Sequence, residues 1–166
     1  ITSIYTPLIN GGSILIYKDD DIYSTLKNNF EVSHSDIVKL TPAHLSLVSE
    51  FKFNKTNVKK LILGGEILTV ELCKKITNKF KGIRIFNEYG PTEATVGCMI
   101  YEYSENRDKA GAVPIGKPID NTQIYILDKN YNLCPKNVIG QIAISGACVG
   151  NGYYNNDELT NKKFIT

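Results

Sequence analysis

The residues of this 166-residue chain that are best suited to chemistry are contiguous, Asn-Glu-Tyr-Gly-Pro-Thr-Glu-Ala-Thr at positions 87–95. They follow an apolar run at 83–86 that is typical of a short buried strand. Pro91 lacks a backbone donor and restricts Gly90, so we expect the chain to leave the sheet and turn here. The turn would present an amide, an aromatic ring, a hydroxyl and a carboxylate, groups that can contact a purine, a phosphate and a hard cation. A solvated surface loop with an Asx-type turn is the alternative interpretation.

The elements that must position this stretch alternate between helices and strands. Periodicity predicts helices at about 1–8, 22–30, 42–51 and 70–80, and strands at 13–17, 36–40, 58–63 and 83–86. Such alternation requires right-handed crossovers and a parallel sheet, so the predicted fold class is α/β.

Local signals mark the ends of these helices. Thr41 followed by Pro42, and Thr69, are predicted N-caps, and an acidic run at 19–21 precedes the second helix. Pro7 should kink or shorten the first helix, which Gly11-Gly12 ends.

Three unusual stretches lie where predicted strands end. Lys39 lies at the end of the second strand, Gly64-Gly65-Glu66 follow the third, and residues 87–93 follow the fourth. Ligands of parallel sheets bind beyond the carboxyl ends of the strands. We therefore expect these stretches to share one edge of the sheet.

The pattern changes after Glu93. Strands are predicted at 94–103, 122–128 and 141–145, with a polar loop at 104–110, a turn at 129–130, a bend at 150–152 and a short helix at 157–164. We expect an α/β part at 1–103 and a mostly β segment at 104–166, divided near Ser104.

Bulk composition excludes several classes of function. A net charge of +2 is too small to indicate binding to nucleic acid or an anionic membrane, and no run of residues predicts a membrane span or a signal peptide. The four cysteines lack Cys-x-x-Cys spacing, so neither a metal cluster nor a disulfide framework is predicted, and a reducing cytoplasm fits. Both ends look cut, so we expect a piece of a larger protein.

Residues 87–95 resemble the core motif of amino-acid adenylation domains of non-ribosomal peptide synthetases, in the adenylate-forming superfamily. Further stretches agree in order and spacing, namely 61–66, 114–118 with 121–122, 140–146, 152–153, and 158–160 with Phe164. Pro91 favours amino acids over the substrates of fatty-acid and acyl-CoA ligases. The resemblance covers essentially the whole chain and implies the large N-terminal domain of these enzymes, passing into its β-barrel subdomain.

The resemblance implies a nucleotide site at Gly64, Gly65, Glu66, Asn87, Glu88, Tyr89, Gly90 and Thr92. Asn87 would bond the adenine amine, and Tyr89 would stack on the base. The two glycines of the 64–65 pair would let backbone approach the ligands without a Cβ. Thr92 would bond a phosphate oxygen and Glu93 would help hold Mg²⁺, which makes these two the implied catalytic residues.

The implied reaction is attack by an amino-acid carboxylate on the α-phosphorus of ATP, giving aminoacyl-AMP and pyrophosphate. The aminoacyl group would pass to the phosphopantetheine thiol of a peptidyl carrier domain, with a condensation domain as a further partner. The family's phosphate loop, ribose-binding Asp and catalytic Lys have no counterpart in residues 1–166, so we expect the isolated chain to be inactive. Gln141 and Asn151 depart from the usual Glu and Arg of the later motif.

The resemblance also implies a side-chain pocket for the substrate, at Thr2, Lys39, Ile62, Gly64, Glu88, Val96 and Gly97. Lys39 and Glu88 can satisfy each other there, and a carboxamide could use both charges, so asparagine is the predicted substrate. Glutamine is the main rival, and a purely structural ion pair is the alternative interpretation. Another acid ligase of the superfamily, or a non-catalytic domain that keeps the fold, are the competing functions.

Overall fold

The computed structural model describes residues 2–18 and 21–165, which divide into two compact units. The first contains the residues up to Tyr89 together with Met99–Lys117. The second contains Gly90–Cys98 together with the residues from Pro118 onward. These units differ from a division near Ser104, which remains a prediction about domain organisation.

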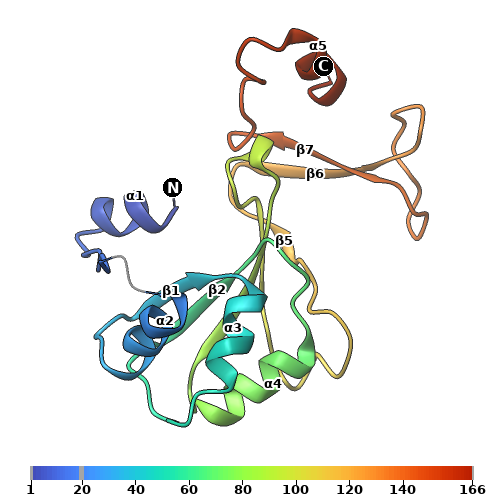
Figure 1. Ribbon diagram of the computed structural model, residues 1–166. Coiled ribbons are helices and arrows are strands. Elements are labelled where there is room, and N and C mark those ends of the chain that lie inside the picture. Colours follow the sequence, from blue (N-terminus) through green and yellow to red (C-terminus); the bar gives the residue numbers. More distant parts are fainter. Residues whose placement is uncertain (1, 19–20, 166) are drawn as a thin grey trace. The chain divides into compact units, whose positions relative to one another are not determined.

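The first unit is an α/β structure (Figure 1). Its elements are α1 (Thr2–Ile9), α2 (Ile22–Glu31), β1 (Ile37–Leu40), α3 (Pro42–Ser49), β2 (Lys60–Leu63), α4 (Val70–Lys79), β3 (Arg84–Tyr89) and β4 (Met99–Glu102), with β5 (Lys117–Pro118) at its boundary. The sheet order is β1-β2-β3-β4-β5, in which β1, β2 and β3 are parallel and β4 runs antiparallel to β3. The predicted α/β class with a mainly parallel sheet is confirmed.

The helix starts follow the predicted capping residues. The Thr41 hydroxyl accepts from the His44 amide at 3.4 Å, with Pro42 as the first helical residue. The Thr69 hydroxyl accepts from the Leu72 amide at 3.3 Å. A carboxylate oxygen of Asp21 accepts from the Ser24 amide at 2.9 Å, and of the predicted acidic run only Asp21 is among the described residues. Each cap satisfies a backbone donor that the first turn cannot satisfy itself.

Three strand predictions are wrong in extent or existence. Residues 13–17 form no strand, and Ile16 is 90% exposed, because none of the described strands pairs with this stretch. β3 does not end at Phe86 but continues through Tyr89, since β4 supplies backbone partners as far as the Tyr89–Met99 pair. The strand predicted at 94–103 begins only at Met99, because Thr92–Ala94 forms a 3-10 turn (η1) instead.

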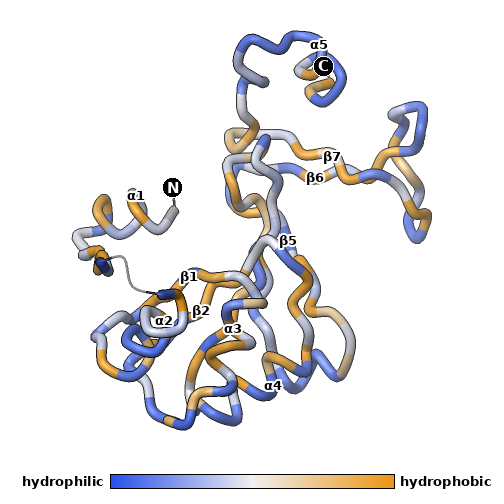
Figure 2. The backbone as a smooth tube through the Cα atoms, in the orientation of Figure 1, coloured by the Kyte–Doolittle hydropathy of each residue, from blue (hydrophilic) through white to orange (hydrophobic). Residues whose placement is uncertain are grey.

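The core of the first unit lies between the sheet and its helices. Hydrophobic residues, coloured orange, concentrate along β1 and β2 (Figure 2). Alternate strand residues turn fully inward, and Leu61, Leu63 and Ile85 are each at most 1% exposed. They join one cluster with buried residues of the helices, such as Phe30 and Ile76. Burial of each such side chain contributes about 1.5–3 kcal/mol, which fixes the sheet against the helix layer.

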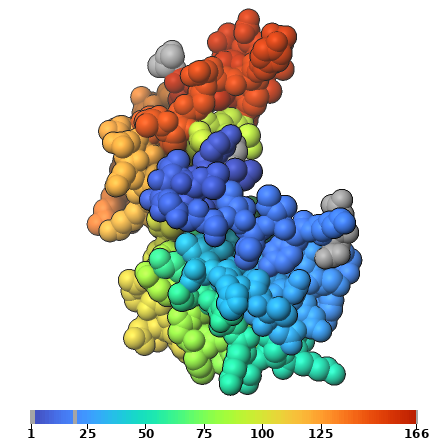
Figure 3. Space-filling view, turned by 90° about the vertical axis from the view of Figure 1, so that its left-hand side faces the viewer, coloured from blue at the N-terminus to red at the C-terminus, as the bar shows by residue number. Residues whose placement is uncertain are grey.

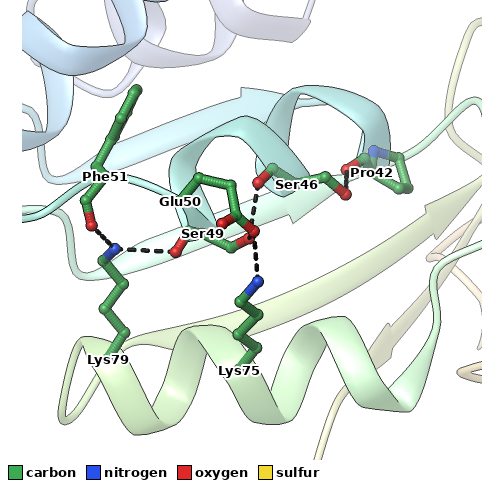
Figure 4. Close-up of polar contacts among 7 residues, drawn as sticks. All are labelled: Pro42, Ser46, Ser49, Glu50, Phe51, Lys75 and Lys79. Carbon is green, nitrogen blue, oxygen red and sulfur yellow. Dashed lines mark hydrogen bonds and ion pairs between the residues drawn. The ribbon is translucent and has the colours of Figure 1, made fainter.

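Side-chain contacts tie these helices to one another. The Tyr23 ring meets the Phe51 ring edge-on at 5.0 Å, which joins α2 to the residues that follow α3. In Figure 3 the surface formed around residues 25–50, coloured blue to cyan, faces the viewer. From α4, the Lys79 ammonium donates to the carbonyl oxygens of Ser49 and Phe51, and Lys75 pairs with Glu50 (Figure 4). Burial lowers the pKa of Lys79, and the two carbonyls at the end of α3 gain a donor that the helix cannot provide.

The second unit contains η1, a β-ribbon and a short helix. β6 (Thr122–Leu127) pairs antiparallel with β7 (Gln141–Gly146), with Ile124 opposite Ile144. α5 (Asp157–Lys163) begins at Asn156, whose side-chain oxygen accepts from the Leu159 amide. The strands predicted at 122–128 and 141–145 and the helix predicted at 157–164 are confirmed. Among the helices of the described residues, none is long and apolar enough to cross a bilayer.

Gly116 should tolerate substitution far less well than Gly82. Both have a left-handed backbone, at φ +88° and +83°, so alanine costs each about 1–2 kcal/mol of strain. A Cβ at Gly116 would also lie 1.9 Å from the Ile100 carbonyl oxygen, whereas one at Gly82 meets nothing within 4 Å. Urea unfolding should show Gly116→Ala less stable than Gly82→Ala by about 1–3 kcal/mol or more. Equal losses would contradict this packing.

Candidate functional site

The carboxyl ends of β1, β2 and β3 lie at one edge of the sheet in the first unit. The strand register pairs Lys39 with Ile62, and Leu63 with Asn87. The structure therefore brings the stretch around Lys39, the loop at residues 64–66 and the end of β3 together, as their positions after predicted strands indicated.

Lys39 and Glu88 form an ion pair at this edge. The Lys39 ammonium contacts one carboxylate oxygen of Glu88, and the two side chains are 21% and 16% exposed. Two charges that are this far removed from water are costly unless each has a partner. The predicted mutual satisfaction of the two residues is confirmed, and it leaves a partly exposed cation and anion side by side.

The glycine pair after β2 has two different structural reasons. A Cβ on Gly64 would lie 2.9 Å from the Glu88 carbonyl oxygen, so the absence of a side chain allows the ends of β2 and β3 to approach. Gly65 has φ +86° and open space around it, so the turn itself requires glycine there. The carboxylate of Glu66 accepts from the Ala43 amide at 2.9 Å, which satisfies a free donor in the first turn of α3.

Asn87 is held in a single orientation inside the first unit. It is 4% exposed, and its side-chain nitrogen donates to the carbonyl oxygens of Val113 and Pro114, both at 3.0 Å. Because both amide hydrogens are used, the group that Asn87 can still offer to a ligand is its acceptor Oδ1. The sequence did not identify these carbonyl partners, although the stretch from Pro114 was among those that carry the resemblance.

In the second unit, a tight turn carries Thr92 and Glu93. Any Cβ on Gly90 would lie 2.5 Å from the Val96 carbonyl oxygen, and Thr95 and Val96 both have positive φ, at 53° and 75°. Positive φ is costly for β-branched residues, so the surrounding contacts must hold this backbone in place. Gly97 closes the turn by donating to the Thr95 carbonyl at 3.0 Å.

Glu93 has a partner that the sequence did not predict. The Tyr153 hydroxyl donates to one carboxylate oxygen of Glu93. This hydrogen bond lowers the pKa of Glu93, with a smaller contribution from the charge of Lys163, and it raises the pKa of Tyr153. Tyr153 belongs to a stretch that carries the resemblance, but nothing in that stretch indicated contact with a residue 60 positions earlier.

The chemistry of Glu93 fits a magnesium site completed by a ligand. Across the described residues, no group of three or more His, Cys, Asp or Glu could hold a metal by itself. Mg²⁺ commonly takes one or two carboxylates and completes its shell with water and substrate phosphates. One oxygen of Glu93 is bonded to Tyr153, and its second oxygen is of the hard type that Mg²⁺ prefers.

The candidate residues divide between the two units. The first unit contains Lys39, Ile62, Gly64, Gly65, Glu66, Asn87, Glu88 and Tyr89. The second unit contains Gly90, Thr92, Glu93, Val96 and Gly97. Thr2 begins α1, but its side chain is outside the described part of the structure. Assembly of the two sets into one site remains a prediction.

Comparison with known proteins identifies close relatives. A family model described as AMP-binding enzyme matches residues 1–154. The chain is 47% identical to bacitracin synthase 3 of Bacillus licheniformis and 41% identical to tyrocidine synthase 3 of Brevibacillus parabrevis, in each case over 99% of its length. It spans only 3% of the length of each of these two relatives.

Solved structures share the fold at lower identity. One is described as an NRPS protein containing adenylation and PCP domains; it has a TM-score of 0.85 at 23% identity, over 96% of this chain and 33% of that chain. Another, the nonribosomal peptide synthetase FmoA3, has a TM-score of 0.86 at 19% identity, over 99% of this chain and 19% of that chain. At such identities the likeness shows the fold.

Replacing Asn87 by aspartate should destabilise the first unit. The carboxylate would place an oxygen against the carbonyls of Val113 and Pro114, leaving a buried acceptor and a partly buried one without this donor. We expect Asn87→Asp to lower the free energy of unfolding by about 2 kcal/mol or more. Asn54→Asp, at an exposed loop position, is the matched control and should stay within about 0.5 kcal/mol of wild type in urea unfolding. Similar small changes in both variants would contradict the buried amide contacts.

Proposed function

Because the chain belongs to the family of AMP-binding enzymes, we propose that it supplies part of the active site of an amino-acid-activating adenylation domain. In the proposed reaction, an amino-acid carboxylate attacks the α-phosphorus of ATP and gives aminoacyl-AMP and pyrophosphate. The observation that carries the proposal is the family match over residues 1–154, which includes every candidate nucleotide residue.

The residues of the first unit suit the adenosine part of the nucleotide. Because the side-chain nitrogen of Asn87 already donates to two carbonyls, its Oδ1 atom is the group left to accept a hydrogen bond. The exocyclic amine of adenine is a donor that such an acceptor can bind. The half-buried Tyr89 provides an aromatic face for the base. Catalysis by such a site depends mainly on positioning the nucleotide and the carboxylate relative to each other.

Thr92 and Glu93 are proposed to act on the phosphates. The Thr92 hydroxyl can donate to a phosphate oxygen, and the carboxylate of Glu93 would hold the Mg²⁺ of the bound nucleotide. When bound, the metal neutralises phosphate charge and stabilises the transition state. A glutamate carboxylate is ionised at neutral pH, as metal binding requires, and the lowered pKa of Glu93 extends this ionised range to more acidic pH.

After activation, the aminoacyl group is proposed to pass to the phosphopantetheine thiol of a peptidyl carrier domain. One solved structure with this fold is described as containing both adenylation and PCP domains, which supports such a partner. A condensation domain is the proposed further partner, because the relatives are peptide synthases many times longer than this chain.

Asparagine is the proposed amino acid. The ion pair of Lys39 and Glu88 offers a cationic donor and an anionic acceptor, and a carboxamide can satisfy both. Aspartate would match Lys39 but place like charge against Glu88. Leucine or valine would leave both charges without a ligand partner, and sites built on polar contacts can reject such side chains by roughly 10⁴. Glutamine has the same head group with one more methylene, worth about 1–3 kcal/mol, so it is the closest rival.

In the full-length protein, Glu93→Gln should abolish amino-acid-dependent ATP–pyrophosphate exchange. A neutral amide cannot replace the carboxylate toward Mg²⁺ and developing phosphate charge. The loss should be the same from about pH 6 to 8, because Glu93 has a lowered pKa and does not titrate there. Glu105→Gln, at an exposed position, is the control and should retain wild-type exchange. A wild-type rate for Glu93→Gln would show that the residue is only a loop carboxylate.

Exchange measured with asparagine, glutamine and aspartate tests the substrate. We expect the wild type to prefer asparagine. Glu88→His should shift the preference toward aspartate, because removal of the carboxylate leaves Lys39 to pair with that of the substrate. The same change at the exposed Glu105 should leave the order unaltered. Preference of the wild type for aspartate would rule out the asparagine assignment.

A further inference from the structure

Residues that follow β7 fold back onto the turn that carries Glu93, within the second unit. The Gly150 amide donates to the Glu93 carbonyl oxygen at 2.8 Å. The Thr95 hydroxyl donates to the Cys148 carbonyl oxygen at 2.6 Å. Together these bonds hold the backbone on both sides of Ala94, so the later segment determines where the Glu93 side chain starts.

The side chain that reaches Glu93 from this segment is itself fixed. The backbone amide of Tyr153 donates to the Thr160 hydroxyl at 2.9 Å. The ring of Tyr153 meets the Phe164 ring edge-on, with the ring centroids 5.7 Å apart. Gly152 has φ +127°, and a Cβ there would lie 2.5 Å from the Thr160 methyl group. The middle of α5, through Thr160, and its C-cap residue, Phe164, therefore set the place of the Tyr153 hydroxyl.

We propose that Tyr153 is a positioning residue that holds one carboxylate oxygen of Glu93 and thereby presents the other to the magnesium ion of the bound nucleotide. This inference rests on the proposed function. Glutamate has three rotatable side-chain bonds, and a fixed hydrogen bond reduces the freedom that metal binding would otherwise have to remove. In this proposal the Tyr153 hydroxyl acts on the metal only through the Glu93 carboxylate to which it donates.

The test uses the full-length synthetase carrying Tyr153→Phe, which removes the hydroxyl and keeps the ring against Phe164. Exchange should fall roughly tenfold in kcat, the effect of losing one hydrogen bond to a charged group, and more Mg²⁺ should be needed for half-maximal rate. The KM for the amino acid should not change. Tyr154→Phe is the matched control, because Tyr154 is the adjacent residue and is 94% exposed. It should behave as wild type.

Metal affinity supplies a measurement that does not depend on turnover. Mn²⁺ binding in the presence of a non-hydrolysable ATP analogue can be followed by electron paramagnetic resonance. Tyr153→Phe should weaken Mn²⁺ binding roughly tenfold, because one hydrogen bond to a charged group is lost. A tenfold change corresponds to about 1.4 kcal/mol of binding free energy. Added to Glu93→Gln, the same change should weaken binding no further, because the residue through which it acts is already lost.

The outcomes separate this inference from the proposed function. Unchanged Mn²⁺ affinity in Tyr153→Phe, with an active wild type, would overturn the positioning role. So would equal losses from Tyr153→Phe in the wild-type and Glu93→Gln backgrounds, because that result indicates an independent structural effect. Absence of amino-acid-dependent exchange in the wild type, with Mn²⁺ and the nucleotide analogue still bound, would instead contradict the proposed function.

Discussion

Antiparallel pairing of β4 with β3 is the interaction on which the first part of the candidate site depends. It extends β3 three residues beyond Phe86 and places Asn87, Glu88 and Tyr89 in a hydrogen-bonded ladder. A backbone held in this way has little freedom, so the side chains that it carries start from fixed positions. The same residues in an open loop would have to be ordered by the ligand, at a cost of about 1–2 kcal/mol for each backbone position.

Placing polar residues inside a sheet creates a requirement for partners, and the first unit meets it in two ways. Asn87 donates to two backbone carbonyls from the segment before β5, while Glu88 takes Lys39 from β1. These contacts leave two kinds of functional group at the edge where the parallel strands end: the side-chain oxygen of Asn87, and the ion pair of Lys39 and Glu88. Buried polar groups of this kind stabilise the site only when every member is satisfied.

The second unit also holds a candidate residue, Glu93, in a fixed place, but it does so with a turn and not with a sheet. Its turn at residues 90–98 contains positive φ at two β-branched residues, a strained conformation that nearby contacts must maintain. Hydrogen bonds between this turn and the segment after β7 provide those contacts: Thr95 donates to the Cys148 carbonyl, Gly150 donates to the Glu93 carbonyl, and Tyr153 donates to the Glu93 carboxylate. The pKa of that carboxylate is lowered by a neutral hydroxyl more than by any cation, so the shift depends on the position of the Tyr153 side chain.

Local rules in the sequence determined much of this protein. Apolar periodicity located α2, α3 and α4, capping threonines marked the starts of α3 and α4, and alternation of elements predicted the parallel order of β1 to β3. These features depend on neighbours within a few residues, which is the range over which a single sequence is informative. The candidate residues at strand ends, and the family itself, could also be recognised from residue types and spacing.

Only the tertiary structure decided which of these segments find partners. An apolar stretch at 13–17 has the composition of a strand but pairs with none of the described strands, whereas polar residues 87–89 extend β3 because β4 lies beside them. The carbonyl partners of Asn87 lie 26 and 27 positions away, and Tyr153 lies 60 positions from Glu93. Contacts over such separations arise from how the elements pack, because hydrogen bonding depends on distance and direction in space and not on position along the chain.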